Sequence, residues 1–135
     1  MADFFDTNVV VYAFDNAEPA KQAVARRLMR DHPDAVISTQ VLLEFYSVVT
    51  RTFSPSLPTD IALKALTSLA DLEVVPADAE LVVRAAETST SHQVSIWDAM
   101  IIETARLAGC ATLYSEDLQD GLIVRGVTVQ NPFAT

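Results

Sequence analysis

The stretch Asp3-Phe4-Phe5-Asp6-Thr7-Asn8 decides the fold prediction, because a short aromatic segment ends in an acidic residue and passes at once into polar turn residues. Aromatic residues favour strands, whereas Asp, Thr and Asn side chains bond to the backbone in turns. The stretch Ala111-Thr112-Leu113-Tyr114 has the same character and leads into Ser115-Glu116-Asp117. Two strands that both run into acidic turns predict a sheet with charged groups at one rim.

Along the rest of the chain, segments rich in β-branched and aromatic residues alternate with longer segments of helical period. This alternation predicts an α/β fold, a three-layer α/β/α sandwich whose central parallel sheet has about five strands. The strands are expected near residues 2 to 5, 35 to 38, 72 to 75, 111 to 114 and 127 to 129. The helices are expected near residues 8 to 14, 18 to 31, 39 to 51, 59 to 70, 78 to 91 and 96 to 108.

Residues that cap or stop helices set these boundaries. Pro33 ends the second helix, because the residue before a proline avoids helical geometry, and Ser38 or Thr39 can cap the third. The proline-containing stretch 53 to 58 ends the third helix and is the one plausible mobile loop. Gly109 is expected in the C-cap role after the last helix.

The composition is that of one globular domain spanning residues 1–135. The chain is 50% hydrophobic and long enough to bury a core. Cys110 is the only cysteine, which excludes an internal disulfide and a cysteine-based metal site, so we expect a core thiol. The sequence shows neither a leader-like N-terminus nor a membrane-spanning run, and we therefore expect a soluble, cytoplasmic protein.

The charge is strongly acidic, with 18 Asp and Glu against 9 Lys and Arg and a formal net charge of −9. This balance argues against broad, nonspecific binding to a polyanion. A local basic cluster nevertheless lies on the second expected helix and consists of Lys21, Arg26, Arg27 and Arg30. The cluster predicts either a local nucleic-acid-binding surface or an ordinary solvated helix face.

Four acidic residues occupy positions where an α/β chain does not normally place a charge. We call them the acidic quartet: Asp6, Glu44, Asp98 and Asp117. Two carboxylates about 4 Å apart repel by roughly 4 kcal/mol at an effective dielectric constant near 20, so a converging set needs a cation. Oxygen-only ligands favour Mg²⁺ or Mn²⁺. The quartet therefore predicts a divalent-metal site.

Three members of the quartet also have a structural interpretation. Asp6 suits an ordinary strand-to-helix turn, and Asp98 can form a capping-box-like pair with Ser95. Glu44 lies on the apolar stripe of its helix, where a salt bridge to Arg26 or Arg51 would be the structural alternative to a metal.

The turns after the two strands supply further candidates. The hydroxyls of Thr7 and Ser115 can orient a carboxylate or a water, or can cap the following helices. Asp120 is a supporting candidate or a ligand of a second metal ion, and Glu116 is expected to face solvent.

Four segments, taken together and in this order, resemble the PIN-domain nucleases, and within them the VapC toxins of bacterial toxin-antitoxin pairs. The segments are Phe5-Asp6-Thr7-Asn8-Val9, Thr39-Gln40-Val41-Leu42-Leu43-Glu44-Phe45, Ile96-Trp97-Asp98-Ala99 and Leu113-Tyr114-Ser115-Glu116-Asp117-Leu118-Gln119-Asp120-Gly121. The resemblance implies a PIN-like α/β/α sandwich, a homodimer, RNA as the substrate and a cognate antitoxin protein as partner. It also implies that the acidic quartet binds Mg²⁺ or Mn²⁺.

Carried over by position, Asp6 and Asp98 are the expected direct metal ligands, while Glu44 and Asp117 bind metal or orient water. A metal ion lowers the pKa of a bound water and neutralises charge on the phosphate, which suits hydrolysis of RNA. One alternative is a non-catalytic PIN-like subunit that acts through a protein partner. A phosphohydrolase of small phosphates is the other, but the Asp6 turn lacks the second Asp of an aspartyl-phosphate motif.

Overall fold

A computed structural model describes residues 2–134 of the chain. Its centre is a six-stranded sheet with the order β3-β2-β1-β4-β6-β5. The strands are β1 (Phe4–Phe5), β2 (Val36–Ser38), β3 (Glu73–Val75), β4 (Thr112–Tyr114), β5 (Ile123–Val124) and β6 (Val127–Gln130). The first five in this order pair in parallel, at or next to the predicted positions.

The expectation of about five strands missed β5, which pairs antiparallel with β6 at the edge of the sheet. A tight turn joins the two strands, with positive φ angles of 54° at Arg125 and 82° at Gly126. Two successive positive φ angles match the twist of a hairpin, and glycine adopts them without a steric penalty. Strand β5 has only two residues and lies next to β6 along the chain, so it depends on pairing with β6 and was not predicted as a separate strand.

Six α-helices surround the sheet and agree with the predicted positions. They are α1 (Thr7–Tyr12), α2 (Pro19–Asp31), α3 (Thr39–Ser47), α4 (Thr59–Leu69), α5 (Ala79–His92) and α6 (Ile96–Leu107). Ser38 caps α3 by accepting a hydrogen bond from the backbone N–H of Val41. The helix expected at residues 39 to 51 is α-helical only to Ser47. A π-helical turn, η1 (Val48–Thr52), follows it. Among residues 2–134, no helix has both the length and the apolar character needed to cross a membrane.

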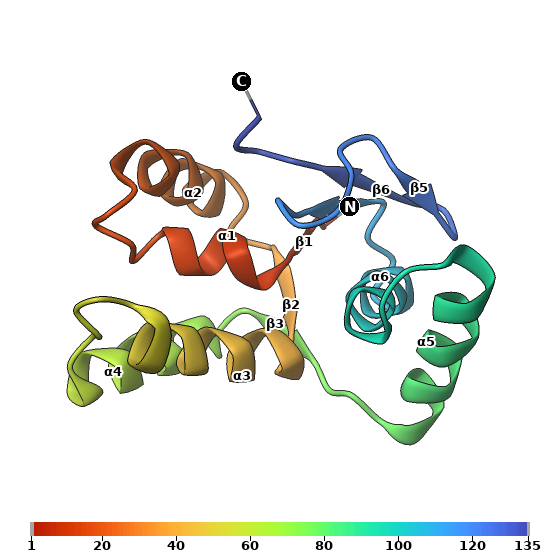
Figure 1. Ribbon diagram of the computed structural model, residues 1–135, viewed down its shortest axis with the longest axis horizontal. Coiled ribbons are helices and arrows are strands. Elements are labelled where there is room, and N and C mark those ends of the chain that lie inside the picture. The colour runs from red at the N-terminus through yellow and green to blue at the C-terminus, as the bar shows by residue number, and fades with distance from the viewer. Residues whose placement is uncertain (1, 135) are drawn as a thin grey trace.

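The helices form two layers, one on each side of the sheet (Figure 1). Helices α1 to α4 lie on one side, and α5 and α6 lie on the other, where α6 contacts β2, β4 and β6. Right-handed crossovers produce this arrangement, because the chain moves outward from β1 to β3 and then returns to place β4 on the other side of β1. The predicted three-layer α/β/α sandwich is confirmed.

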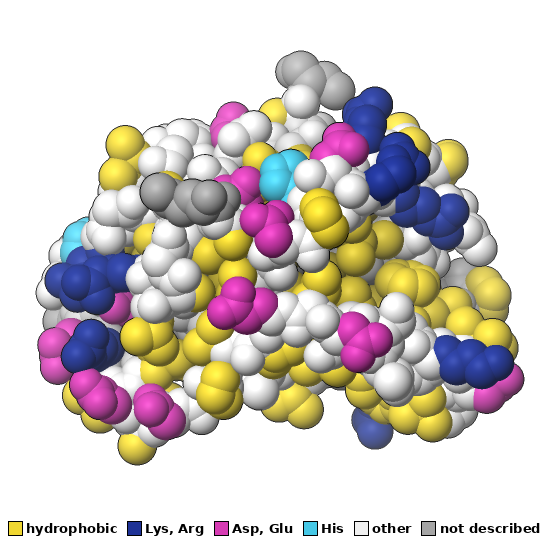
Figure 2. All heavy atoms as spheres, turned by 180° about the vertical axis from the view of Figure 1, so that it is seen from behind, with side chains coloured by type: hydrophobic (Ala, Val, Ile, Leu, Met, Phe, Trp, Pro, Cys, Tyr) yellow, Lys and Arg dark blue, Asp and Glu magenta, His cyan; other side chains and the backbone are white. Residues whose placement is uncertain are grey.

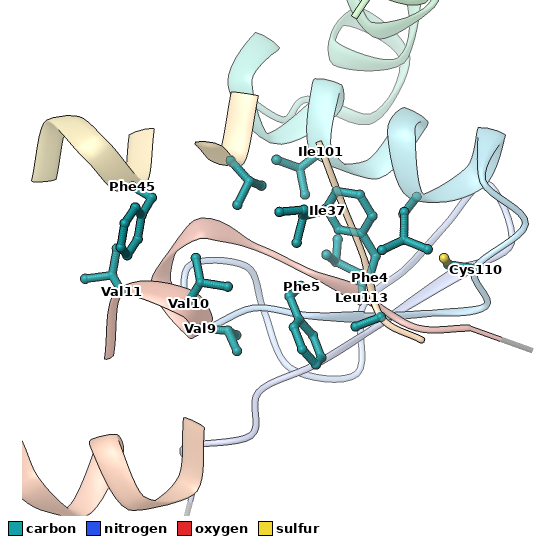
Figure 3. Close-up of a cluster of buried hydrophobic side chains, with 14 of the residues drawn as sticks. Phe4, Phe5, Val9, Val10, Val11, Ile37, Phe45, Ile101, Cys110 and Leu113 are labelled. Atoms are coloured by element: carbon teal, nitrogen blue, oxygen red, sulfur yellow. The ribbon is translucent and has the colours of Figure 1, made fainter. Parts of the chain in front are cut away.

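The core fills both faces of the sheet. Phe4 and Phe5 are 0% and 1% exposed although they are neighbours whose side chains point to opposite faces. Figure 3 shows Phe4 directed toward Ile101 of α6 and Phe5 directed away from it. Burial of each ring contributes about 2 to 3 kcal/mol, so β1 is anchored from both sides. Cys110 is buried in the same core, as expected for a core thiol.

The order of the strands determines where polar groups meet. From β1 the strand order runs to β2 and β3 on one side and to β4 and β6 on the other, which makes the gap between the carboxyl ends of β1 and β4 the topological switch point. The backbone N–H of Asp6 donates to the carbonyl of Tyr114 over 3.0 Å, so the two exits lie side by side.

A buried carboxylate on the other side of the sheet had not been singled out in the sequence. Glu103 of α6 is 1% exposed and accepts hydrogen bonds from Thr88 of α5 at 2.9 Å and from Arg125 of the hairpin at 3.3 Å. A buried charge is tolerated when it is paired and hydrogen-bonded. Glu103 therefore joins α5, α6 and the β5–β6 hairpin.

Replacing Glu103 by alanine is expected to lower the free energy of unfolding by about 2 kcal/mol, because Thr88 and Arg125 lose a charged acceptor. The control is Glu80→Ala, which removes an exposed i,i+4 partner of Arg84 and should cost about 0.5 kcal/mol. Urea denaturation followed by circular dichroism measures both variants. Equal losses would contradict the structural role of Glu103.

Candidate active site

Asp6 is the most constrained member of the acidic quartet. It follows β1, caps α1 and is 5% exposed. One carboxylate oxygen, Oδ1, accepts from the backbone N–H of Thr7 at 2.7 Å, and Oδ2 accepts from the hydroxyl of Ser115 at 2.7 Å. Asp6 is thus fixed from both strand exits, as its place at the switch point requires.

Glu44 reaches the same region from α3. Its Oε1 accepts from the hydroxyl of Thr7 at 2.9 Å and from the amide of Gln40 at 3.2 Å. The Gln40 amide also approaches the carbonyl of Trp97 at 3.4 Å and so links α3 to the start of α6. Gln40 was not predicted as a site residue, because a glutamine on a half-buried helix face gives no signal in the sequence.

The salt bridge considered for Glu44 is not formed. No basic side chain pairs with Glu44 in the part of the chain that the structure describes. The guanidinium of Arg26 instead donates to the carbonyl of Ala13 at 2.8 Å. Glu44 therefore remains a carboxylate held only by neutral donors.

The two hydroxyls act on carboxylates. Thr7 donates to Glu44, and Ser115, which is 0% exposed, donates to Asp6. Ser115 also accepts from the backbone N–H of Asp117 at 3.2 Å, which shapes the turn after β4. Of the two interpretations given to these hydroxyls, orientation of a carboxylate is the one that the structure supports.

Asp98 and Asp117 are less restrained. The backbone N–H of Asp98 donates to the hydroxyl of Ser95 at 3.0 Å, so the capping interpretation is correct for this backbone group. Within residues 2–134, neither the Asp98 nor the Asp117 carboxylate accepts a hydrogen bond. Asp98 is half-buried and Asp117 is exposed, so both side chains are available to bind another group.

Electrostatics couple three of the four acids. Burial raises the pKa of Asp6 to about 6, and repulsion from Asp117 and Glu44 adds to this effect, while the hydrogen bonds from Ser115 and Thr7 oppose it. Asp98 is not among the groups that shift this pKa, and Gln40 lies between Glu44 and the start of α6. The structure therefore brings Glu44 and Asp117 near Asp6, whereas for Asp98 it shows only that the preceding carbonyl, of Trp97, contacts Gln40.

The donor chemistry of this region suits a hard divalent cation, since the acids offer only oxygen atoms and the ionisation of Asp6 is opposed by its surroundings. No three His, Cys, Asp or Glu side chains between residues 2 and 134 form a ready-made metal cage. Binding a cation would thus require the less restrained carboxylates of Asp98 and Asp117 to move toward Asp6.

A cavity of about 770 Å³ opens beside these acids, between α1 and the segment that links η1 to α4. Thr7, Glu44 and Asp117 line its acidic end. The rest of the lining mixes polar residues, Asp15 and Glu116 among them, with a set of apolar side chains: Val11, Phe14, Val48, Phe53, Pro55 and Leu57. The predicted proline-containing loop therefore forms a wall of the cavity. A ligand in this space can contact both carboxylates and apolar side chains.

Glu116 and Asp120, in the turn after β4, both have hydrogen-bonding partners that the sequence did not predict. Glu116 does not face solvent freely, because it accepts from the hydroxyl of Tyr12 at 2.7 Å and from the ammonium of Lys21 at 2.7 Å. Although burial acts to raise it, the pKa of Glu116 is lowered by these two hydrogen bonds. Asp120 accepts from the backbone N–H of Asn131 at 2.8 Å and fixes the C-terminal segment rather than the acids.

The basic cluster on α2 divides into paired and free residues. Lys21 is bound to Glu116, and Arg26 to the carbonyl of Ala13. Within the described chain, Arg27 and Arg30 are exposed and have no side-chain hydrogen bond. Figure 2 shows Lys and Arg side chains gathered over α2.

The sheet is doubly wound and carries acidic side chains at its switch point. These features define an α/β protein whose candidate site lies at the carboxyl ends of its strands. Residues 4–119 match the family model of the PIN domain. The chain belongs to the PIN-domain family, as the four segments of the sequence predicted. Comparison with curated proteins finds no match.

Solved structures with a similar fold come from several bacteria. A toxin-antitoxin complex from Klebsiella pneumoniae is similar with a TM-score of 0.74 and 17% identity, over 97% of this chain and 98% of that chain. VapC20 from Mycobacterium tuberculosis, described as a sarcin-ricin loop cleaving toxin, gives 0.70 and 24%, over 84% and 88%. VapBC2 from Rickettsia felis, bound to a promoter DNA fragment, gives 0.68 and 20%, over 97% and 98%.

The pKa of Asp6 makes stability depend on pH in protein kept free of metal by EDTA. The folded state holds the proton of Asp6 more tightly than the unfolded state, so stability falls as the pH rises from 3.8 through about 6. Relative to Asp6→Asn, which cannot ionise, the unsubstituted chain should lose about 2 kcal/mol of unfolding free energy between pH 4 and pH 8. Urea denaturation of both proteins measures the difference. A difference that does not vary with pH would contradict the raised pKa.

Proposed function

We propose that this chain is a metal-dependent endoribonuclease and the toxin of a toxin-antitoxin pair. The observation that carries the proposal is the buried Asp6 carboxylate at the switch point, held by Ser115 and Thr7 and repelled by Glu44 and Asp117. Membership of the PIN-domain family and similarity to a toxin described as cleaving the sarcin-ricin loop support it.

The residues of the acidic quartet would divide two roles between them, cation binding and proton acceptance. Asp6 and Asp98 would hold a divalent cation directly, and Glu44 and Asp117 would hold it or accept a proton from an attacking water. When bound, Mg²⁺ or Mn²⁺ supplies a water of lowered pKa and positive charge opposite the phosphate. Thr7 and Ser115 keep the carboxylates of Glu44 and Asp6 aimed into the site. With a pKa of about 6, Asp6 is largely ionised at neutral pH and able to bind a cation.

The partners follow from the same site. RNA is the proposed substrate, and α2 supplies the positive charge that an acidic protein needs to approach it. The proposed second partner is a cognate antitoxin, for which the apolar part of the cavity offers a binding surface next to the acids. Similarity to proteins solved as toxin-antitoxin complexes supports this partner. A homodimer in the cytoplasm remains the expected state.

Cleavage of a mixed, structured RNA pool tests the proposal. The unsubstituted chain should cut RNA with Mg²⁺ or Mn²⁺ and not with EDTA, while Asp6→Asn and Asp98→Asn should each lower the rate by about 100-fold or more, because each loses a cation ligand. Asp71→Asn is the control, since Asp71 is exposed and its side chain has no hydrogen-bonding partner within residues 2–134. Gel analysis of end-labelled RNA, with folding checked by circular dichroism, gives the rates.

The same experiment distinguishes the nuclease from the alternative function, a non-catalytic PIN-like subunit. An unsubstituted chain that cuts no RNA with either metal, yet binds a protein partner, would favour the non-catalytic PIN-like subunit. Equal activity in Asp6→Asn and Asp71→Asn would instead show that any nuclease present does not use the acidic quartet.

RNA binding by α2 is a separate prediction. In an Asp6→Asn background that does not cut RNA, Arg27→Glu with Arg30→Glu should weaken binding about tenfold and make its salt dependence shallower, because two phosphate contacts are lost. Lys64→Glu with Arg84→Glu makes the same change in net charge on α4 and α5 and is the control. Arg26 suits the test less well, because its guanidinium also fixes the end of α1. Fluorescence anisotropy at several salt concentrations compares the pairs, and equal weakening would contradict a specific role for α2.

A further inference from the structure

A compact polar cluster lies between the turn after β4 and the first two helices. Its centre is Glu116, whose Oε1 accepts from the hydroxyl of Tyr12 at 2.7 Å and whose Oε2 accepts from the ammonium of Lys21 at 2.7 Å. Lys21 also lies 3.2 Å from the Tyr12 hydroxyl and 4.8 Å from the centroid of its ring. The three side chains thus form a closed triangle of contacts that joins α1, α2 and the turn.

The backbone of the same turn is fixed by a second set of contacts. The N–H of Glu116 donates to Oδ1 of Asn8 at 3.1 Å, and the N–H of Asp117 donates to the hydroxyl of Ser115 at 3.2 Å. Among the described residues, the buried Nδ2 of Asn8 has no partner, so the bond to Glu116 sets the orientation of this amide. Residues 115 to 117 are therefore held by α1 through the backbone and by α1 and α2 through Glu116.

This cluster restrains a residue that has no restraint of its own. Asp117 is exposed, lines the acidic end of the cavity, and its carboxylate accepts no hydrogen bond from residues 2–134. The backbone of the turn consequently sets where this side chain is attached, and rotation about the bonds of the side chain brings the carboxylate toward Asp6. A ligand group works only when its support holds it near the productive geometry, and a displacement of about 1 Å can cost about 100-fold in rate.

We propose that Glu116 is a positioning residue, which ties the turn to Tyr12 and Lys21 and thereby fixes where the Asp117 carboxylate stands in the cation site. The inference rests on the proposed function, because it takes Asp117 to serve a divalent cation. It also gives Lys21 a role other than RNA binding, since its ammonium is used by Glu116.

Two roles of Lys21, as a nearby positive charge and as a residue that holds Glu116, predict opposite changes in cation affinity when Lys21 is replaced. Lys21→Met removes a positive charge close to the acids, and on charge alone the variant should bind a cation more tightly. If Lys21 acts by holding Glu116, the same change releases the turn and weakens cation binding. Tyr12→Phe removes one hydrogen bond from Glu116 without any change in charge and keeps the ring that packs against Phe133.

The test is isothermal titration of the full chain with Mn²⁺, without RNA. We expect Lys21→Met to weaken Mn²⁺ binding about tenfold and Tyr12→Phe about threefold, the scale of losses when a partner that orients a ligand is removed. In an Asp117→Asn background, both effects should disappear, since the residue that they position no longer binds. Thermal unfolding confirms that each variant is folded, and Tyr12→Phe provides the test if Lys21→Met does not fold.

The possible outcomes are distinct. Tighter or unchanged Mn²⁺ binding by Lys21→Met, with unchanged binding by Tyr12→Phe, overturns the positioning role alone. Losses that persist in the Asp117→Asn background also overturn it, because they would act on a different residue. Failure of the unsubstituted chain to bind Mn²⁺ overturns the proposed function and this inference with it.

Discussion

The burial of one carboxylate at the junction of β1 and β4 is the constraint on which the rest of the site depends. Asp6 is almost completely enclosed, and an enclosed carboxylate needs donors on both oxygens. Thr7 and Ser115 supply them, one from each strand exit. The parallel pairing of β1 with β4 is what brings Ser115 to Asp6, across 109 positions of sequence. The sheet therefore determines both the location of the charge and its hydrogen bonds.

The net charge of −9 leaves many acids of this chain without a basic partner, including all four members of the acidic quartet within residues 2–134. Some acids outside the site have basic partners, as Glu116 has Lys21, Glu80 has Arg84 and Glu103 has Arg125, whereas others, such as Asp71, form no salt bridge within the described chain. Within residues 2–134, no member of the acidic quartet has one. Uncompensated carboxylates gathered at one place are destabilising in the folded chain, and such groups with perturbed pKa values are concentrated at functional sites. The raised pKa of the buried Asp6 carboxyl, to which Glu44 and Asp117 contribute, is the feature that agrees with the proposed cation site.

Local properties of the sequence predicted most of the strands and helices, and the elements that were missed are those whose conformation depends on packing. The five parallel strands were found because apolar segments, helical periods and capping residues are visible along the chain. Strand β5 and the π-helical turn η1 were missed. Each consists of only a few residues whose conformation is set by packing, in β5 by pairing with β6 and in η1 by the end of α3. Glu116 was expected to face solvent because its partners lie in helices far away along the chain.

The sequence by itself determined the order of strands and helices, the positions of the acids after strand ends and at the starts of helices, and the family. Tertiary structure alone decided which of these groups meet. Glu44 and Asp117 act on Asp6, Gln40 links Glu44 to the Trp97 carbonyl at the start of α6, and Lys21 binds Glu116. The physical reason is that periodicity and capping act over a few residues, whereas hydrogen bonds and charge interactions depend on distances in space that only the assembled sheet creates.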